Sequence, residues 1–323
     1  MAERIDWIDM AKGFGIVLMV VGHMGIPASL SNWVYSFHMP LFLFLSGVVF
    51  NVDKYSLKRL VIKRIQQLIV PYLSFSIIVF IGNYFLNEPW LTKNIKSFII
   101  YGNQSALWFL PVLFLTQLIA YPVIKRHNKY FNILFLIVVF SLSAIVDDGK
   151  RFLPYNLASL PLSLFFFSLG HINKKFVLSG FCSFFNMTGN KIIVVLFWGI
   201  LSFVFSQLIA PPLKLAYGSL GGGGIYSIAI AFLGLMCVFS FCFWSRENKY
   251  IKDLFTYVGL NTLAILGLSQ VIYLYAKKLL TIFPLNSVVS FSFRIAILIL
   301  ALKGAITLIN NYLPFIVGKN RKK

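Results

Sequence analysis

Charged side chains are scarce in this sequence, in which Asp, Glu, Lys and Arg make up 12% of the 323 residues. Soluble globular proteins carry about a quarter, so the composition excludes an ordinary soluble domain. Hydrophobic residues reach 59%, and the mean hydropathy is +0.83. They stand in runs of about 20 residues, the length of a helix that crosses the hydrocarbon core. The sequence therefore predicts an all-α, polytopic integral membrane protein.

Cysteine is also rare, and acidic residues are missing from the cores of the apolar runs. Cys182, Cys237 and Cys242 lack the spacing of a metal site or a disulfide framework. We expect them to be small hydrophobic packing residues. No Asp or Glu lies in the apolar core of any run, so a buried Ser-His-Asp triad is not apparent. We expect no metal.

The net charge of +20 is distributed in a way that argues against nucleic-acid binding. The basic residues lie in short loops between apolar runs, where they orient helices. If the N-terminus is cytoplasmic, twenty Lys and Arg fall on the inner side and seven on the outer side. This bias predicts that both termini are cytoplasmic, with a short basic tail at 315–323. The inner loops are expected to attract anionic membrane lipids.

Run length predicts about ten transmembrane helices in one domain over 1–323. Glu3, Asp6 and Asp9 interrupt the basic N-terminal region, and no convincing cleavage site follows, so the first helix is expected to stay. No internal repeat of fixed period is visible. The predicted spans are 12–30, 33–51, 68–87, 106–124, 131–147, 154–172, 191–210, 224–244, 254–276 and 288–314.

His23 lies in the first predicted span, eleven residues after Lys12. Eleven residues bring a helix to within about 20° of its starting face and advance it by about 16 Å. An ionisable residue at mid-depth is costly and suggests function. His23 would either donate a structural hydrogen bond to a neighbouring helix or act as a general base on a hydroxyl. Lys12 is expected to pair with Asp9, as an interfacial ion pair or beside a phosphorylated ligand.

Three later spans offer candidate substrate contacts. His38 stands near the outer start of the second span and is expected to line the same cavity mouth as His23. Trp108 begins the fourth span, where a tryptophan is ordinarily an interfacial belt residue. Ser269 and Gln270, in the ninth span, are expected to face the bundle interior.

Basic residues near or inside the spans have two open interpretations. The stretch Lys58–Arg64 is basic and amphipathic, and it suits either anionic lipid or a polyphosphate cofactor. Arg294 and Lys303 lie inside the last span. They would snorkel towards opposite surfaces, or at least one of them would face a substrate.

Five motifs follow one another along nearly the whole chain. In order, they are Arg4-Ile-Asp-Trp-Ile-Asp-Met-Ala-Lys-Gly with His23 ten intervening residues after Lys12, Phe37-His-Met-Pro-Leu-Phe-Leu-Phe-Leu-Ser-Gly47, Arg64 with Pro71-Tyr72, Trp108-Phe-Leu110 and Phe165-Phe-Phe-Ser-Leu-Gly170. Together they resemble the membrane acyltransferase family 3. The Lys-Gly and His-Met-Pro versions of the motifs resemble its fucose 4-O-acetylase-like branch.

The resemblance implies a multi-pass O-acyltransferase of the bacterial plasma (inner) membrane. The expected reaction moves an acyl group, usually acetyl, from cytoplasmic acyl-CoA to a sugar hydroxyl of a cell-envelope polysaccharide or its lipid-linked precursor. By position, His23 becomes the catalytic histidine and Lys12 its basic partner. The CoA phosphates would meet Arg4, Lys12 and Arg64, and the acceptor candidates are Asp9, His38, Trp108, Ser269, Gln270 and Arg294.

The chain departs from the family pattern in the ninth span. Many members have a histidine where this chain has Gly267-Leu-Ser-Gln270, so a role for that histidine is absent or passes to Ser269, Gln270 or His38. Whether His23 acts as a base or carries the acyl group transiently stays open. The alternative from a different class is a transporter or exporter of a glycan or lipid-linked intermediate, with the histidines and Arg294 as contacts.

Overall fold

The computed structural model describes residues 5–86, 102, 105–145, 153–180, 190–208, 212–283 and 286–319. These residues form helices and turns, and they contain no β-strand. The helices are α1 (Asp6–Gly22), α2 (Ala28–Val48), α3 (Leu57–Arg64), α4 (Val70–Leu86), α6 (Phe109–Lys125), α7 (Lys129–Ile145), α8 (Leu160–Ile172), α10 (Lys191–Leu208), α11 (Tyr226–Ser245), α12 (Lys249–Leu260), α13 (Thr262–Leu280) and α14 (Ser287–Tyr312). Short 3₁₀ or π turns occur at Ile65–Ile69, Ala106–Trp108, Pro154–Ser159, Phe176–Gly180, Leu215–Tyr217 and Pro314–Val317.

Each predicted span contains a helix, and the helical membrane class is confirmed. Within the described part of the chain, six helices are long and apolar enough to cross a membrane. They are Leu57–Gly82, Ala106–Lys125, α10, α11, α13 and α14. The exact number of spans and the cytoplasmic position of both termini stay predictions.

The ninth predicted span is wrong, because 254–276 crosses a helix break. α12 ends at Leu260, and α13 begins at Thr262. Between them, Asn261 leaves the helical conformation and accepts a hydrogen bond from the Asn310 amide at 2.9 Å. Apolar residues continue across this break, so run length alone does not reveal it.

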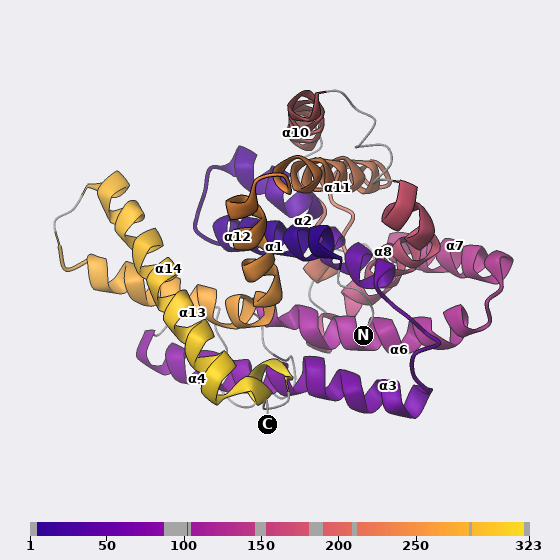
Figure 1. The fold of residues 1–323 in the computed structure, drawn as a ribbon, viewed down its shortest axis with the longest axis horizontal. Coiled ribbons are helices and arrows are strands. Elements are labelled where there is room, and N and C mark those ends of the chain that lie inside the picture. The colour runs from indigo at the N-terminus through magenta and orange to yellow at the C-terminus, as the bar shows by residue number, and fades with distance from the viewer. Residues whose placement is uncertain are drawn as a thin grey trace. The chain divides into compact units, whose positions relative to one another are not determined.

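The chain divides into two compact units, and the single domain over 1–323 stays a prediction. Unit 1 comprises 1–56, 115–152 and 156–260. Its central helix is α2, which packs against α1, α8, α10 and α11, while α7 packs on α8. α12 lies against α1 (Figure 1).

Glycines set the closest helix contacts of unit 1. Gly13 and Gly259 bring the backbones of α1 and α12 together, and Gly47 and Gly170 do the same for α2 and α8. A Cβ on Gly259 would lie 1.9 Å from the carbonyl oxygen of Asp9. The interface therefore has no room for a side chain at this position.

Unit 2 comprises 57–114, 153–155 and 261–323. In it, α13 packs against both α4 and α14. The Tyr275 hydroxyl of α13 donates to the carbonyl oxygen of Gly82 at 3.2 Å, and Gly267 makes room for the Phe75 ring of α4. The basic tail is described only as far as residue 319.

The cysteines of the described residues agree with their expected role in packing. Cys237 and Cys242 are buried free thiols on α11. Cys182 lies outside the described residues.

Replacing Gly259 with alanine should weaken the α1–α12 contact. The new Cβ meets backbone rather than a flexible side chain, so we expect a loss of about 1–3 kcal/mol in the free energy of unfolding. Thermal unfolding of the purified protein in detergent measures this loss of stability. Gly304→Ala on α14 is the control, because nothing lies within 4 Å of its Cβ position. Equal destabilisation by the two variants would contradict this packing.

Candidate functional site

His23 lies at the C-terminal end of α1, directly after Gly22, and is exposed. The expected position inside a helix over 12–30 is wrong, because α1 begins earlier and ends earlier. Asp6 and Asp9 occupy its first turn, where carboxylates stabilise the N-terminus of a helix. Gly25 has φ +76°, and the chain turns there into α2. The imidazole therefore lies on an accessible turn.

Tyr35 of α2 contacts His23 directly. Its hydroxyl oxygen lies 3.1 Å from His23 Nδ1, and the two rings meet edge to face with centroids 5.8 Å apart. His38, three residues further along α2, meets Tyr35 edge to face at 5.0 Å. We call these three residues the His-Tyr-His cluster.

His38 is the buried member of this cluster. It is 3% exposed, and its Nδ1 lies 2.9 Å from the carbonyl oxygen of Val34. A carbonyl only accepts hydrogen bonds, so Nδ1 carries a proton, and in the neutral ring Nε2 has the lone pair. The expected place of His38 near a helix start is wrong, because α2 begins at Ala28 and His38 is its eleventh residue.

Sequence reasoning placed His38 near His23 but missed Tyr35, which connects them. Tyr35 precedes His38 by three residues, so the two share one face of α2. That spacing predicts the contact between Tyr35 and His38 within α2. The contact with His23 is tertiary, and Tyr35 is one of 15 tyrosines, none of which the sequence distinguishes as a partner.

The other end of α1 holds two ion pairs. Lys12 Nζ lies 3.4 Å from Asp9 Oδ1, which confirms the predicted pairing. Lys252 of α12 pairs with Asp6 at 2.5 Å. Lys12 and His23 are separated by about 16 Å along the helix axis. Arg4, the other cation predicted near the start of this helix, lies outside the described residues.

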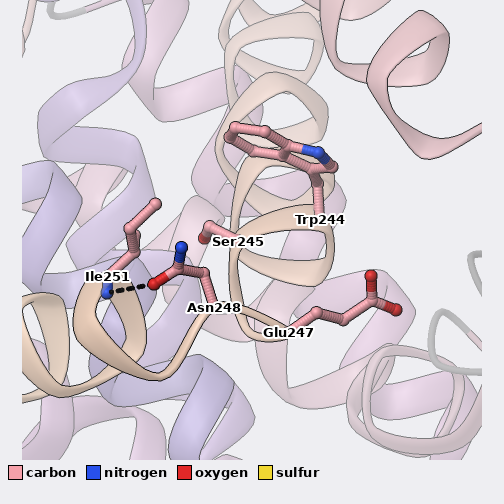
Figure 2. Close-up of a pocket in the computed structure, with 5 residues that line it drawn as sticks. All are labelled: Trp244, Ser245, Glu247, Asn248 and Ile251. Carbon is pink, nitrogen blue, oxygen red and sulfur yellow. Dashed lines mark hydrogen bonds between the residues drawn. The ribbon is translucent and has the colours of Figure 1, made fainter.

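A pocket of about 430 Å³ lies at the turn between α11 and α12 (Figure 2). Its lining residues are Trp244, Ser245, Glu247, Asn248 and Ile251. Asn248 Oδ1 caps α12 by accepting the backbone N–H of Tyr250 and Ile251 at 3.0 and 3.2 Å. Lys191 pairs with Glu247 and holds the pKa of that carboxyl below its ordinary value, so Glu247 stays ionised.

The Ser245 hydroxyl in the pocket wall is buried, and no described residue forms a hydrogen bond with it. Ile251 directly precedes Lys252, the residue that pairs with Asp6. The pocket therefore lies at the Lys12 end of α1, away from the His-Tyr-His cluster.

Three predicted residues gather in unit 2, where α13 meets the turn Ala106–Trp108. Gln270 Oε1 accepts the backbone N–H of Ala106 at 3.4 Å. Trp108 is buried in that turn. Ser269 is buried as well, and its hydroxyl has no hydrogen-bond partner in the part of the chain that the structure describes.

The two predicted arginines of unit 2 each bond a neighbour on the same stretch of helix. Arg64 Nη1 donates to Gln67 Oε1 at 2.7 Å. Arg294 Nη2 donates to Ser290 Oγ at 2.8 Å, and its Nε is buried without a hydrogen-bond partner in the described ranges. Lys303, on the same helix as Arg294, is exposed.

One family of known proteins matches the chain. The model of an acyltransferase domain matches residues 5–309, which includes most of both units. Neither a curated protein nor a solved structure matches the chain.

Tyr35→Phe should release His23 from a single tautomer. A neutral hydrogen bond contributes about 0.5–1.5 kcal/mol, so its loss should change the tautomer ratio by up to about tenfold. Nitrogen-15 NMR of labelled protein measures this ratio, with the His23 signals assigned by their loss in His23→Gln. Tyr226→Phe, at an exposed position of α11, is the control. Unchanged His23 signals in Tyr35→Phe would contradict the contact.

Proposed function

The chain belongs to acyltransferase family 3 and is a membrane acyltransferase, and we propose that it acylates a sugar hydroxyl of the bacterial cell envelope. The donor is cytoplasmic acyl-CoA, with acetyl as the expected group. The acceptor is an envelope polysaccharide or its lipid-linked precursor. The enzyme works as a multi-pass protein of the bacterial inner membrane. The fucose 4-O-acetylase-like branch stays a prediction.

The His-Tyr-His cluster is the observation that most directly supports this reaction. Tyr35 occupies the Nδ1 side of His23, so Nε2 is the nitrogen left for chemistry. When the Tyr35 oxygen accepts the Nδ1 proton, Nε2 keeps its lone pair. His23 is exposed at the end of α1, where donor and acceptor can both approach the ring.

The lone pair on Nε2 serves the transfer in either of two ways. As a base, Nε2 takes the proton of the sugar hydroxyl while the oxygen attacks the thioester carbonyl. The new C–O bond forms, the C–S bond breaks, and the proton passes to the departing thiolate. As a nucleophile, Nε2 first takes the acyl group and releases the thiolate, and the sugar hydroxyl then displaces the imidazole. Both routes move the acyl group from sulfur to oxygen and a proton from oxygen to sulfur.

The donor is proposed to enter at the Lys12 end of α1. Lys12 and Arg4 are the proposed cations for the CoA phosphates at this end, since phosphate is bound by Lys and Arg. A phosphate contact of Arg64, in unit 2, stays a prediction. The pocket at the α11–α12 turn lies at the same end of α1 as Lys12, and Trp244 offers an aromatic face of the kind that stacks on a nucleobase. The extended arm of acyl-CoA would then run along α1 towards His23.

The acceptor contacts are proposed from polar residues on several helices. His38 lies behind Tyr35 and steadies the cluster. Asp9 is included because it orients Lys12. The other acceptor contacts expected from the sequence are Trp108, Ser269, Gln270 and Arg294, which belong to unit 2 and stay predictions.

His23→Ala should abolish O-acetylation while glycan export continues. Loss of the base or nucleophile is expected to lower transfer by at least about 100-fold. The measurement is the intensity of O-acetyl signals in proton NMR spectra of glycan purified from cells that carry each variant. Glycan yield is determined on the same samples.

His127→Ala is the matched control. This histidine lies between α6 and α7, is exposed, and pairs with Asp53 at 3.2 Å, so its loss should leave acetylation unchanged. Persistent acetylation in His23→Ala would contradict the catalytic assignment. Loss of exported glycan in that variant, with normal acetylation of the remainder, would favour the transporter.

A further inference from the structure

The charges of the two units differ strongly in their balance. Unit 1 contains fifteen Lys and Arg residues and eight acidic ones. Unit 2 contains fourteen Lys and Arg residues and one acidic residue, Glu88. Unit 2 therefore has a single carboxylate side chain for fourteen cations. In a membrane, the most abundant anions at hand are lipid phosphates.

One of these cations lies on a helix whose apolar side chains are largely exposed. α14 is long and apolar enough to span a membrane. Its apolar side chains are exposed along its length, including Val288 at 73%, Phe293 at 52% and Leu300 at 70%. Arg294 is next to Phe293 on this helix. Placing an arginine among the apolar residues of a membrane-spanning helix costs free energy unless an anion or hydrogen-bond acceptors compensate its charge.

The described residues accept hydrogen bonds from only some of the N–H donors of Arg294. Its Nη2 donates to Ser290, and its buried Nε has no hydrogen-bond partner among the described residues. None of the ion pairs among the described residues includes it. Ser290 lies one turn nearer the start of α14, so this bond draws the guanidinium towards the loop that joins α13 and α14. That end of the helix is about 10 Å from Arg294, within reach of a headgroup.

Lys277 lies at the same level of the hairpin formed by α13 and α14. The Asn310–Asn261 hydrogen bond pairs the end of α14 with the start of α13. Lys277 is sixteen residues beyond Asn261, and Arg294 is sixteen residues before Asn310. With equal rise per residue, both lie about 24 Å from that bond. Lys277 is exposed, so two cations stand at one depth near the loop end.

We propose that the loop end of the α13–α14 hairpin binds the phosphate group of a membrane lipid through Arg294 and Lys277. The planar guanidinium fits phosphate with two parallel hydrogen bonds, and the ammonium adds a point charge. Ser290 holds the guanidinium in place. An anionic phospholipid and the polyprenyl phosphate of a lipid-linked sugar both offer this group. Binding of a bulk phospholipid here requires no acyl transfer, whereas binding of a polyprenyl phosphate rests on the proposed function, in which Arg294 contacts the acceptor.

The test is thermal unfolding of the full-length protein in detergent with three added lipids. Phosphatidylglycerol and undecaprenyl phosphate carry the phosphate, and diacylglycerol lacks it. A lipid that binds the folded state raises Tm, so we expect a saturable rise of several degrees with the two phosphate lipids only. Arg294→Gln should weaken their apparent binding by about 10–100-fold, because a charged hydrogen-bonding partner is lost. The apparent binding by Arg294→Lys should lie between those of the wild type and Arg294→Gln, since lysine keeps the charge but lacks the two parallel N–H donors of the guanidinium.

Lys303→Gln is the matched control, because this lysine lies on the same helix, is exposed, and stands nine residues further along. Its Tm response should equal that of the wild type.

Saturation by undecaprenyl phosphate at a tenfold lower concentration than by phosphatidylglycerol would identify a site for lipid-linked sugars. Equal saturation by both phosphate lipids would identify a site for bulk phospholipid. An unchanged response in Arg294→Gln, or an equal response to diacylglycerol, would overturn the proposal. If Arg294→Gln elutes as an aggregate in size-exclusion chromatography, Arg294→Lys and Lys277→Gln replace it. Weaker apparent binding of the phosphate lipids by these variants supports the proposal, and an unchanged Tm response overturns it.

Discussion

The close approach of α1 to α2 is the constraint on which the candidate site depends. Gly15 and Gly22 lie on one face of α1, seven residues apart, and that face meets α2. A Cβ on Gly22 would lie 3.5 Å from the Tyr35 ring and 3.3 Å from Val34. Because this face carries no side chains at these two positions, α2 can bring the Tyr35 hydroxyl to the imidazole of His23.

The same helix connects the two chemical parts of the proposed reaction. At its N-terminal end, α12 packs on α1 through Gly13 and Gly259, and the ion pairs of Asp6 and Asp9 lie on that side. At its C-terminal end, His23 is accessible. A helix held by close backbone contacts at one end and against α2 at the other keeps these parts at a fixed separation. Transfer of an acyl group from a phosphorylated donor to a distant acceptor needs such a spacing.

The sequence predicts those features that depend on local spacing. Run length and loop charge predict the helices and the membrane class, and a three-residue spacing predicts the Lys12–Asp9 pair. Features that depend on tertiary contact are missed, including the Tyr35–His23 bond and the break at Asn261, which is paired with Asn310. His38 is placed at the wrong point of its helix, because the start at Ala28 follows a turn within the apolar run. The charge imbalance of unit 2 is hidden because its segments are discontinuous in the chain.

The most direct test of the account is the rate at which the purified full-length protein in liposomes releases CoA from acetyl-CoA, with envelope glycan as acceptor. Wild-type release should depend on the glycan. His23→Gln should lower kcat by at least about 100-fold, and KM for acetyl-CoA should stay unchanged because Lys12 is intact. A His23→Gln enzyme that keeps the wild-type kcat, or that loses activity only through KM for acetyl-CoA, would contradict His23 as the centre of acyl transfer.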